Sequence, residues 1–145
     1  MLVKHILSDK GREIIAISQD ALLGDAVRLL AQKHIGAVLA QGPRGTLAGI
    51  LSERDVVRAL SEDAQAALAC PVSAYMTAHV ATCTEDDSVE DLMEMMTRGR
   101  FRHVPVLDDR GRLCGLVSIG DVVKTRIAET VHEAQSLREY ICTTG

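Results

Sequence analysis

Aromatic residues are nearly absent from this sequence: Tyr75, Phe101 and Tyr140 are its only tyrosine and phenylalanine residues, and it has no tryptophan. Proteins that bind single-stranded nucleic acids stack the bases on aromatic side chains, and this chain cannot build such a platform. An excess of positive charge is also missing, because the formal net charge is −4 at pH 7. A nucleic-acid partner requires a basic face, so we expect none here. The core must be built from aliphatic side chains and methionine.

Long apolar runs are missing as well. No stretch approaches the roughly 18 apolar residues of a membrane-spanning helix. The segment 1–10 contains charged residues throughout and does not form the apolar core of a secretory signal. The four cysteines (Cys70, Cys83, Cys114 and Cys142) contain no C-x-x-C pair, which predicts free thiols in a reducing compartment. We therefore expect a cytoplasmic protein without a membrane partner.

Patterns for metal binding and catalysis are equally scarce. His79, Cys83, His103 and Cys114 match no common zinc spacing, so we interpret them as structural residues and expect no metal. No glycine-rich phosphate loop and no convincing Ser-His-Asp or Cys-His arrangement is present. The sequence therefore does not predict an enzyme.

An internal duplication organises the chain. The segment 47–58, Leu-Ala-Gly-Ile-Leu-Ser-Glu-Arg-Asp-Val-Val-Arg, returns as Leu-Cys-Gly-Leu-Val-Ser-Ile-Gly-Asp-Val-Val-Lys at 113–124, a shift of 66 residues without a gap. Over residues 25–57, ten of 33 positions are identical to their counterparts. A repeat of this kind indicates one structural unit built twice.

Each copy contains the same order of predicted elements. In the first copy, strands are expected at 13–17, 37–40 and 46–51, and helices at about 20–34, capped by Ser18 or Asp20, and 53–69. In the second, the counterparts are strands at 79–83, 101–107 and 113–118 and a helix that Asp86, Asp87 or Ser88 can cap. The expected fold is therefore α/β (α+β), with two β-α-β-β-α repeats.

The last helix is predicted to begin near Asp121 and to reach about Tyr140. Apolar residues recur along it at steps of three or four residues beyond the length that a closing helix needs. Either a partner subunit covers its distal end, or the helix folds back over its own domain. We divide the chain into residues 1–72 with the first repeat, 73–130 with the second, and a C-terminal helical extension, 131–145.

A serine and an aspartate three residues later follow the second hairpin strand of each copy: Ser52 with Asp55, and Ser118 with Asp121. This spacing is typical of a helix capping box, in which the hydroxyl and carboxylate satisfy backbone N–H groups. On that interpretation, substitution costs roughly 1 kcal/mol of stability and changes nothing else.

The position of the two turns favours a second interpretation. Ligands in α/β folds bind at strand ends, and the free N–H groups of a helix N-terminus donate hydrogen bonds to phosphate. An aspartate in the turn suits the vicinal hydroxyls of a ribose, because charge-assisted hydrogen bonds of this kind contribute about 1.5–3 kcal/mol each. Hydroxyl, amides and carboxylate together predict a nucleoside phosphate.

These segments resemble the two halves of a cystathionine-β-synthase (CBS) domain pair, also called a Bateman module. The resemblance rests on His34-Ile35-Gly36-Ala37-Val38-Leu39 with 47–55, on Arg100-Phe101-Arg102-His103-Val104-Pro105-Val106 with 115–121, and on Tyr75-Met76-Thr77. It covers about residues 5–130. It implies two sheets related by a pseudo-twofold axis, clefts that bind adenine nucleotides (AMP, ADP, ATP, NAD or S-adenosylmethionine), and a homodimer of two modules.

The resemblance also assigns roles to single residues. It implies ribose-binding carboxylates at Asp55 and Asp121, hydroxyls near the phosphate at Ser52 and Ser118, and a phosphate-binding Arg102 beside His103. In the first copy Gly36 and Ala37 replace this Arg-His pair, which reduces the phosphate contacts expected there. Arg54 can compensate for this loss, and the freed space can admit a larger ligand such as a dinucleotide. The remaining expected ligand-binding positions are the adenine-pocket residues Ile17 and Val80 and the turn residues Ile119 and Gly120.

Two classes of function follow from these patterns. The first is a non-catalytic sensor whose shape changes when an adenine nucleotide binds. The alternative is a ligand-free homodimeric scaffold that acts on a partner protein, in which the two turns serve only as caps. An enzyme is a third and weaker reading, because catalysis in this family belongs to an attached domain.

Overall fold

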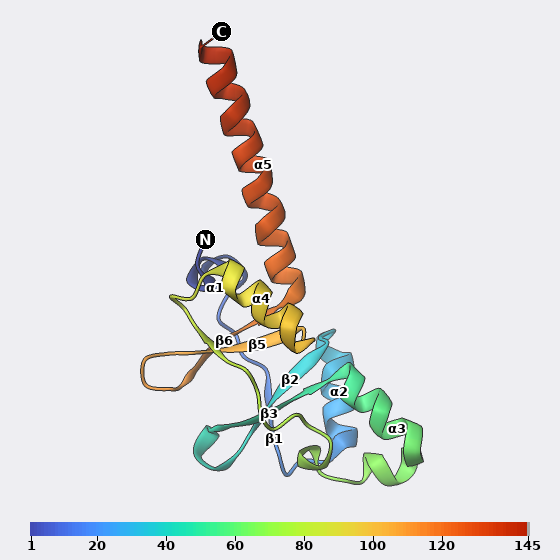
Figure 1. The fold of residues 1–145 in the computed structure, drawn as a ribbon. Coiled ribbons are helices and arrows are strands. Elements are labelled where there is room, and N and C mark those ends of the chain that lie inside the picture. The colour runs from blue at the N-terminus through green and yellow to red at the C-terminus, as the bar shows by residue number, and fades with distance from the viewer. Residues whose placement is uncertain (145) are drawn as a thin grey trace.

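The computed structural model describes residues 1–144, and its elements follow one another twice in the same order (Figure 1). The elements are α1 (Val3–Lys10), β1 (Ala16–Ser18), α2 (Leu23–Lys33), β2 (Ala37–Gln41), the 3₁₀ turn η1 (Pro43–Gly45), β3 (Leu47–Ser52), α3 (Glu53–Leu68), the 3₁₀ turn η2 (Val72–Ala74), β4 (Cys83–Thr84), α4 (Val89–Gly99), β5 (His103–Leu107), β6 (Leu113–Ser118) and α5 (Ile119–Thr144).

Two three-stranded sheets carry the repeats, in the orders β1-β2-β3 and β4-β5-β6. In each sheet the first strand runs parallel to the second, and the second and third form an antiparallel hairpin. The registers are equivalent: Ala37 pairs with Ser52 in one hairpin and His103 with Ser118 in the other. The mixed α/β class and the two β-α-β-β-α repeats predicted from the sequence are confirmed.

Both hairpins turn through a glycine with positive φ. Gly45 has φ +71° and Gly111 has φ +76°, a region that L side chains rarely adopt. In the second turn Asp108 Oδ1 also accepts hydrogen bonds from the N–H groups of Arg110 and Arg112, both at 2.9 Å. The turn residues of the sequence are therefore sufficient to close these hairpins.

The predicted N-terminal cap is correct for α4 and wrong for α2. Ser88 caps α4 by accepting a hydrogen bond from the N–H of Asp91 at 3.0 Å, as one of the expected alternatives. The expectation that Ser18 or Asp20 caps α2 is wrong, because this helix begins after Leu22 without a side-chain cap. Instead the N–H of Leu23 donates to the carbonyl of Cys70 at 2.8 Å. A segment distant in the sequence satisfies this helix end.

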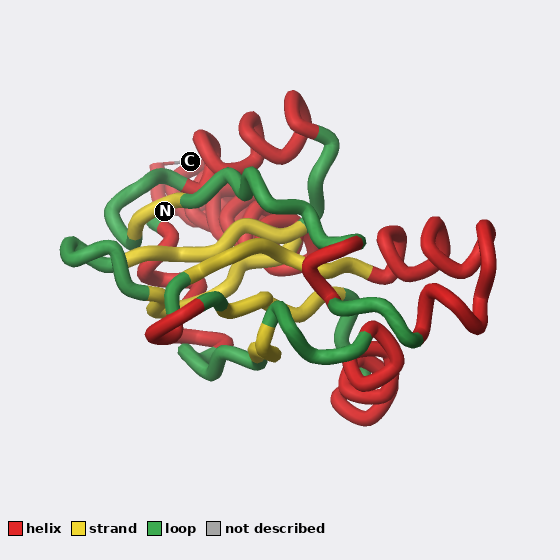
Figure 2. The backbone as a smooth tube through the Cα atoms, turned by 90° about the horizontal axis from the view of Figure 1, so that it is seen from below, coloured by secondary structure: helices red, strands yellow, loops and turns green. Residues whose placement is uncertain are grey.

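The strands of both sheets lie together in the middle of the molecule, and the helices cover their outer sides (Figure 2). The two repeats each have a core between sheet and helices. A third apolar cluster joins the sheets: it contains Leu39 and Ile50 of the first repeat, with Leu113 and Leu116 of the second packed against it. Burial between the sheets holds the repeats face to face.

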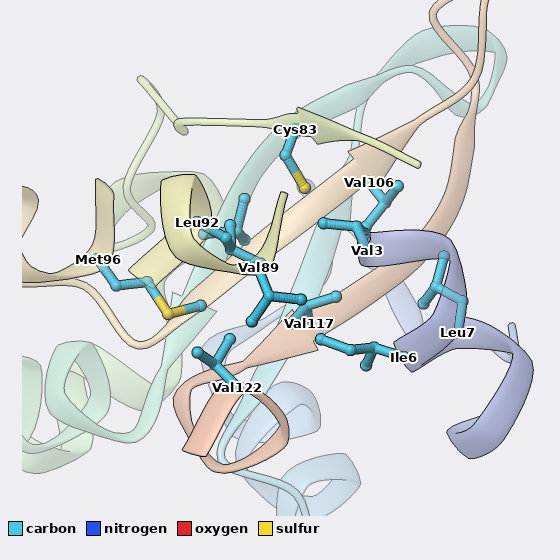
Figure 3. Packing of buried hydrophobic residues seen from close by; sticks show 11 residues of the cluster. Val3, Ile6, Leu7, Cys83, Val89, Leu92, Met96, Val106, Val117 and Val122 are labelled. Atoms are coloured by element: carbon cyan, nitrogen blue, oxygen red, sulfur yellow. The ribbon is translucent and has the colours of Figure 1, made fainter. Parts of the chain in front are cut away.

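Helix α1 packs on the second repeat, although it precedes the first. Val3, Ile6 and Leu7 are at most 4% exposed and belong to the core around β5, β6 and α4 (Figure 3). The linker between the repeats packs on the first repeat in an equivalent way. The N–H of Val72 in the linker donates a hydrogen bond to the carbonyl of Ala21 at 2.8 Å, and the N–H of Val3 in α1 donates one to the carbonyl of Asp87 at 2.9 Å. Each repeat is therefore completed by a segment outside its own β-α-β-β-α run.

Helix α5 extends from the body of the molecule, with its C-terminal half directed away from both sheets (Figure 1). Val122 near its start is fully buried, whereas residues 130–142 are all exposed. The alternative that this helix folds back over its own domain is therefore wrong for these residues. Within the described residues no helix is long and apolar enough to cross a membrane.

Candidate functional site

The turn between β3 and α3 forms the capping box that its spacing predicts. Asp55 Oδ2 accepts hydrogen bonds from the N–H of Ser52 at 2.9 Å and from its hydroxyl at 3.1 Å. The hydroxyl oxygen of Ser52 in turn accepts a hydrogen bond from the N–H of Asp55 at 3.4 Å. Asp55 is only 6% exposed, and its second oxygen, Oδ1, lies 3.9 Å from Arg58 Nη1. The cap thus uses one carboxylate oxygen and leaves the other on the side of an arginine.

The turn between β6 and α5 repeats this geometry and adds a cation. Asp121 Oδ2 accepts from the N–H and hydroxyl of Ser118 at 2.9 and 3.0 Å. Lys10 Nζ, from the end of α1, donates to the same oxygen at 2.7 Å and to the carbonyl of Leu116 at 2.9 Å. Burial by itself would raise the pKa of Asp121, but the hydrogen bonds from Lys10 and Ser118 outweigh it and hold this pKa below its usual value.

A large cleft opens beside the first turn, with a volume of about 710 Å³. We call it the arginine cleft, because Arg54, Arg58, Arg100 and Arg102 line it. Its other lining residues come from both repeats and from the segment before β4: Gly36, Ile50, Ser52, Glu53, Asp55, Thr77, His79, Val80, Ala81, Gly99, Phe101, His103 and Ile119. The lining thus contains four arginines and two acidic residues, Glu53 and the buried Asp55, and this excess of positive charge makes the cleft suited to anions.

A smaller cleft of about 360 Å³ lies by the second turn. We call it the lysine cleft; its lining residues are Lys10, Gly11, Glu13, Ile15, Ile35, Gly36, Ala37, His103, Leu116 and Ser118. The Lys10 ammonium is its only lysine or arginine cation within the described residues, and this group is already paired with Asp121. The lysine cleft therefore offers less positive charge than the arginine cleft.

His103 lines both clefts. A Cβ at Gly36 would lie 3.7 Å from the Cε1 atom of its imidazole, so the ring packs directly against the first repeat. Burial lowers the pKa of His103, the Lys10 and Arg102 cations lower it further, and Asp121 and Glu53 oppose them. Charged groups from around both clefts therefore act on the pKa of this histidine.

The sequence grouped the expected site residues by repeat, but in the structure each cleft combines residues of both repeats. Arg102 of the second repeat lies in the cleft of Asp55, not with Asp121, because each Ser-x-x-Asp turn faces the first hairpin strand of the other repeat. The Gly36-Ala37 pair lines the lysine cleft, beside Ser118. Because the first copy has no Arg-His pair, the lysine cleft beside the Ser118 turn lacks an arginine at this position.

Most of the expected residues border a cleft. Ser52, Arg54, Asp55, Val80, Arg102 and Ile119 line the arginine cleft, Ala37 and Ser118 line the lysine cleft, and Gly36 and His103 line both. Asp121 lies next to Lys10 of the lysine cleft. Ile17 packs against the first core, and Gly120 is exposed in the first turn of α5; neither lines a cleft.

Several cleft residues were missed by the sequence analysis. Arg58 lies one helical turn after Asp55, and Arg100 lies two positions before Arg102, so local spacing was available as a signal. Lys10 is 111 residues away from Asp121, and only the packing of α1 on the second repeat brings them together.

The cysteines lie apart from this chemistry. Cys83 is 3% exposed in the second core, where burial first, and then Asp87 and Cys114, raise its pKa to about 12. It therefore stays a protonated thiol at neutral pH. Among residues 1–144 no three His, Cys, Asp or Glu side chains gather in a way that could hold a metal ion.

Comparison with known proteins gives this architecture its family. The model of the CBS domain matches residues 3–62 and 72–128, one match for each repeat. The chain belongs to the CBS-domain family. The first match begins with α1, which packs on the second repeat, and the second match begins with the linker segment at Val72, which packs on the first repeat.

Relatives of this CBS pair occur as crystal structures and as curated proteins. The CBS-domain protein ATU1752 of Agrobacterium tumefaciens is 44% identical, with a TM-score of 0.83 over 86% of this chain and 92% of that one. The mitochondrial CBS domain-containing protein CBSX3 of Arabidopsis thaliana is 33% identical over 96% of this chain and 71% of its own length. The CBS domain pair of protein MJ0100, in complex with 5′-methylthioadenosine and S-adenosyl-L-methionine, is 26% identical, with a TM-score of 0.79 over 89% and 98% of the two chains.

Proposed function

We propose that this CBS pair is a regulatory module that binds an adenine nucleotide in the arginine cleft. The observation that carries the proposal is the buried carboxylate of Asp55 beside four arginines in a cleft of about 710 Å³. The carboxylate oxygen that the cap does not use suits a ribose hydroxyl, and the guanidinium groups suit phosphate oxygens. The adenosine ligands of the MJ0100 pair support this choice of ligand class.

Each group has a defined part in binding. Asp55 Oδ1 accepts hydrogen bonds from the sugar, while Arg54 and Arg102 contact phosphate from opposite repeats. Val80 and Ile50 provide apolar surface for the base. Because the ligand contacts both repeats, it stabilises one relative position of the two sheets, and it can regulate a target only through this preference. AMP, ADP, ATP and NAD are the candidate ligands, and the proposal assigns the chain no reaction.

Isothermal titration of the wild-type chain with AMP, ADP, ATP, NAD and S-adenosylmethionine tests the proposal. We expect binding of at least one adenine nucleotide, and a loss of about tenfold or more in affinity for Asp55→Asn, since a charge-assisted hydrogen bond is removed. Asp109→Asn, in the exposed β5–β6 turn, is the matched control and should bind like wild type. If no adenine ligand binds or raises the melting temperature, the proposal is rejected.

The scaffold alternative also has an observation in its favour. Val123, Ile127, Val131, Leu137 and Ile141 are each between 47% and 60% exposed along α5. A projecting helix with such a stripe is expected to associate with a second copy or with another protein. We propose a homodimer, which is compatible with nucleotide binding because the stripe lies outside both clefts.

A further inference from the structure

The two clefts differ in charge at several of their equivalent positions. At the shift of 66 residues, Arg102 in the arginine cleft corresponds to Gly36, and Arg54 corresponds to Gly120. His79, also in the arginine cleft, corresponds to Glu13 in the lysine cleft. The duplication has therefore kept the Ser-x-x-Asp turns, whereas arginines line only the cleft beside the first turn; the cation at the second turn is Lys10, which pairs with Asp121.

The protein itself also places a cation against the second carboxylate. Lys10 Nζ lies 2.7 Å from Asp121 Oδ2, whereas the nearest cation to Asp55 is Arg58 at 3.9 Å. Lys10 also replaces a backbone contact: the carbonyl of Ile50 accepts from the N–H of Thr77 at 2.9 Å, and its counterpart Leu116 accepts from the Lys10 ammonium. The lysine is thus held at two points and partly neutralises the Asp121 carboxylate. The cap and the lysine both contact Oδ2, so a ligand hydroxyl can use Oδ1, as at Asp55.

We propose that the two clefts bind chemically different ligands: the arginine cleft binds one phosphorylated adenosine per chain, and the lysine cleft binds an adenosine compound without phosphate. This inference rests on the function proposed above. A phosphate in the lysine cleft meets Glu13 and no arginine, and the one ammonium is already neutralised by Asp121. An uncharged nucleoside avoids this repulsion, and the apolar residues Ile15, Ile35 and Leu116 provide surface for its base.

A sequential titration tests the difference between the clefts. The chain is first saturated with ADP and then titrated with 5′-methylthioadenosine, which carries no phosphate. We expect one ADP per chain, followed by a second binding event that ADP does not block. Arg102→Ala should weaken ADP binding about tenfold or more, because a charge-assisted contact to phosphate is lost. The same substitution should leave the second event in place.

Glu13→Arg offers a gain of binding that a folding defect cannot imitate. Glu13 is exposed at the lysine cleft, and an arginine there replaces an anionic side chain with a cationic one at the position equivalent to His79. We expect this variant to bind a second ADP, whereas the matched Glu13→Gln, which only removes the charge, should bind it at least tenfold more weakly than Glu13→Arg.

The outcomes separate this inference from the proposed function. Two equivalent ADP sites in the wild type, or competition between 5′-methylthioadenosine and ADP without a second event, would overturn the assignment of ligands while the nucleotide-binding function stands. ADP binding that Asp121→Asn abolishes and Arg102→Ala does not would overturn it too. If neither compound binds to the folded chain, both the inference and the proposed function fail.

Discussion

At the scale of residues, the two Ser-x-x-Asp turns show that a cap and a ligand site can share one carboxylate. In both turns Oδ2 accepts the cap hydrogen bonds from serine. What differs is the surroundings: Asp55 faces a cleft with arginines, and Asp121 is paired with Lys10. The capping interpretation from the sequence is thus correct for both turns, and it does not exclude the nucleotide interpretation for either.

The Lys10–Asp121 pair should make stability depend on pH. Because the pKa of Asp121 is lowered in the folded state from its ordinary 3.8, its ionised form stabilises the fold above that pH, and this contribution is lost as the pH falls through the folded value. We expect Lys10→Met to lower the free energy of unfolding by about 1 kcal/mol at pH 7 and by less near pH 3. Urea denaturation at the two pH values measures the difference.

Lys4→Met is the control for this prediction, since Lys4 Nζ lies 4.0 Å from an Asp86 carboxylate that is 83% exposed. It should change stability little at either pH. An effect of Lys10→Met that is the same at pH 7 and pH 3 would show that only its contact with the Leu116 carbonyl matters.

At the scale of elements, the molecule depends on segments that cross from one repeat to the other. Two equivalent glycines, Gly49 and Gly115, admit these crossings. A Cβ at Gly49 would lie 2.5 Å from the carbonyl oxygen of Thr77 in the linker, and one at Gly115 would lie 2.6 Å from Leu7 Cδ2 in α1. The glycines are needed here for close approach between elements, since neither has a positive φ.

Alanine substitutions should distinguish the two crossings. At Gly49 the obstacle is the backbone of Thr77, whose N–H and carbonyl are both hydrogen-bonded to Ile50. At Gly115 the obstacle is the end of the Leu7 side chain, which can change rotamer. Overpacking costs about 1–3 kcal/mol, and we expect Gly49→Ala at the upper end of this range and Gly115→Ala at the lower end. Chemical denaturation of both variants measures the two losses of stability. Equal losses would contradict the expectation that the Thr77 backbone yields less than the Leu7 side chain.

At the scale of the whole molecule, the C-terminal half of α5 is not covered by its own domain. A helix of 26 residues is about 39 Å long at 1.5 Å per residue. Its contacts with the body include the pair of Arg126 with Glu90 at 2.9 Å and that of the N-terminal amine with Glu129 at 3.2 Å. Beyond these, the exposed apolar stripe continues along the projecting half (Figure 1).

Placing charge on this stripe tests the proposed homodimer. Leu137 is 60% exposed, and Leu137→Glu should convert a dimer to a monomer in sedimentation equilibrium because it desolvates a carboxylate in the interface. The neighbouring Ser136→Glu adds the same charge off the stripe and should leave the mass unchanged. Since Leu137 is not buried within the chain, thermal stability of the monomer should be preserved. A wild-type chain that is monomeric at high concentration would remove the basis for this proposal.

The sequence by itself determined the duplicated architecture and the two capped turns. These features depend on local periodicity, on turn glycines and on a serine–aspartate spacing, all of which act over a few residues. The bounds of β2, β3, β5 and β6 accordingly fall within about two residues of the expected ones. The start of α2 was predicted wrongly, because its end group is satisfied by Cys70 from the linker and not by a neighbouring side chain.

Only the tertiary structure decided which residues share a cleft. Arg102 joins Asp55 because the repeats face each other, and Lys10 reaches Asp121 because α1 packs on the opposite repeat. No local pattern encodes either pairing: both arise from the burial of apolar surface between and around the two sheets, which acts without regard to separation along the chain. The charge difference between the two clefts is a consequence of that packing.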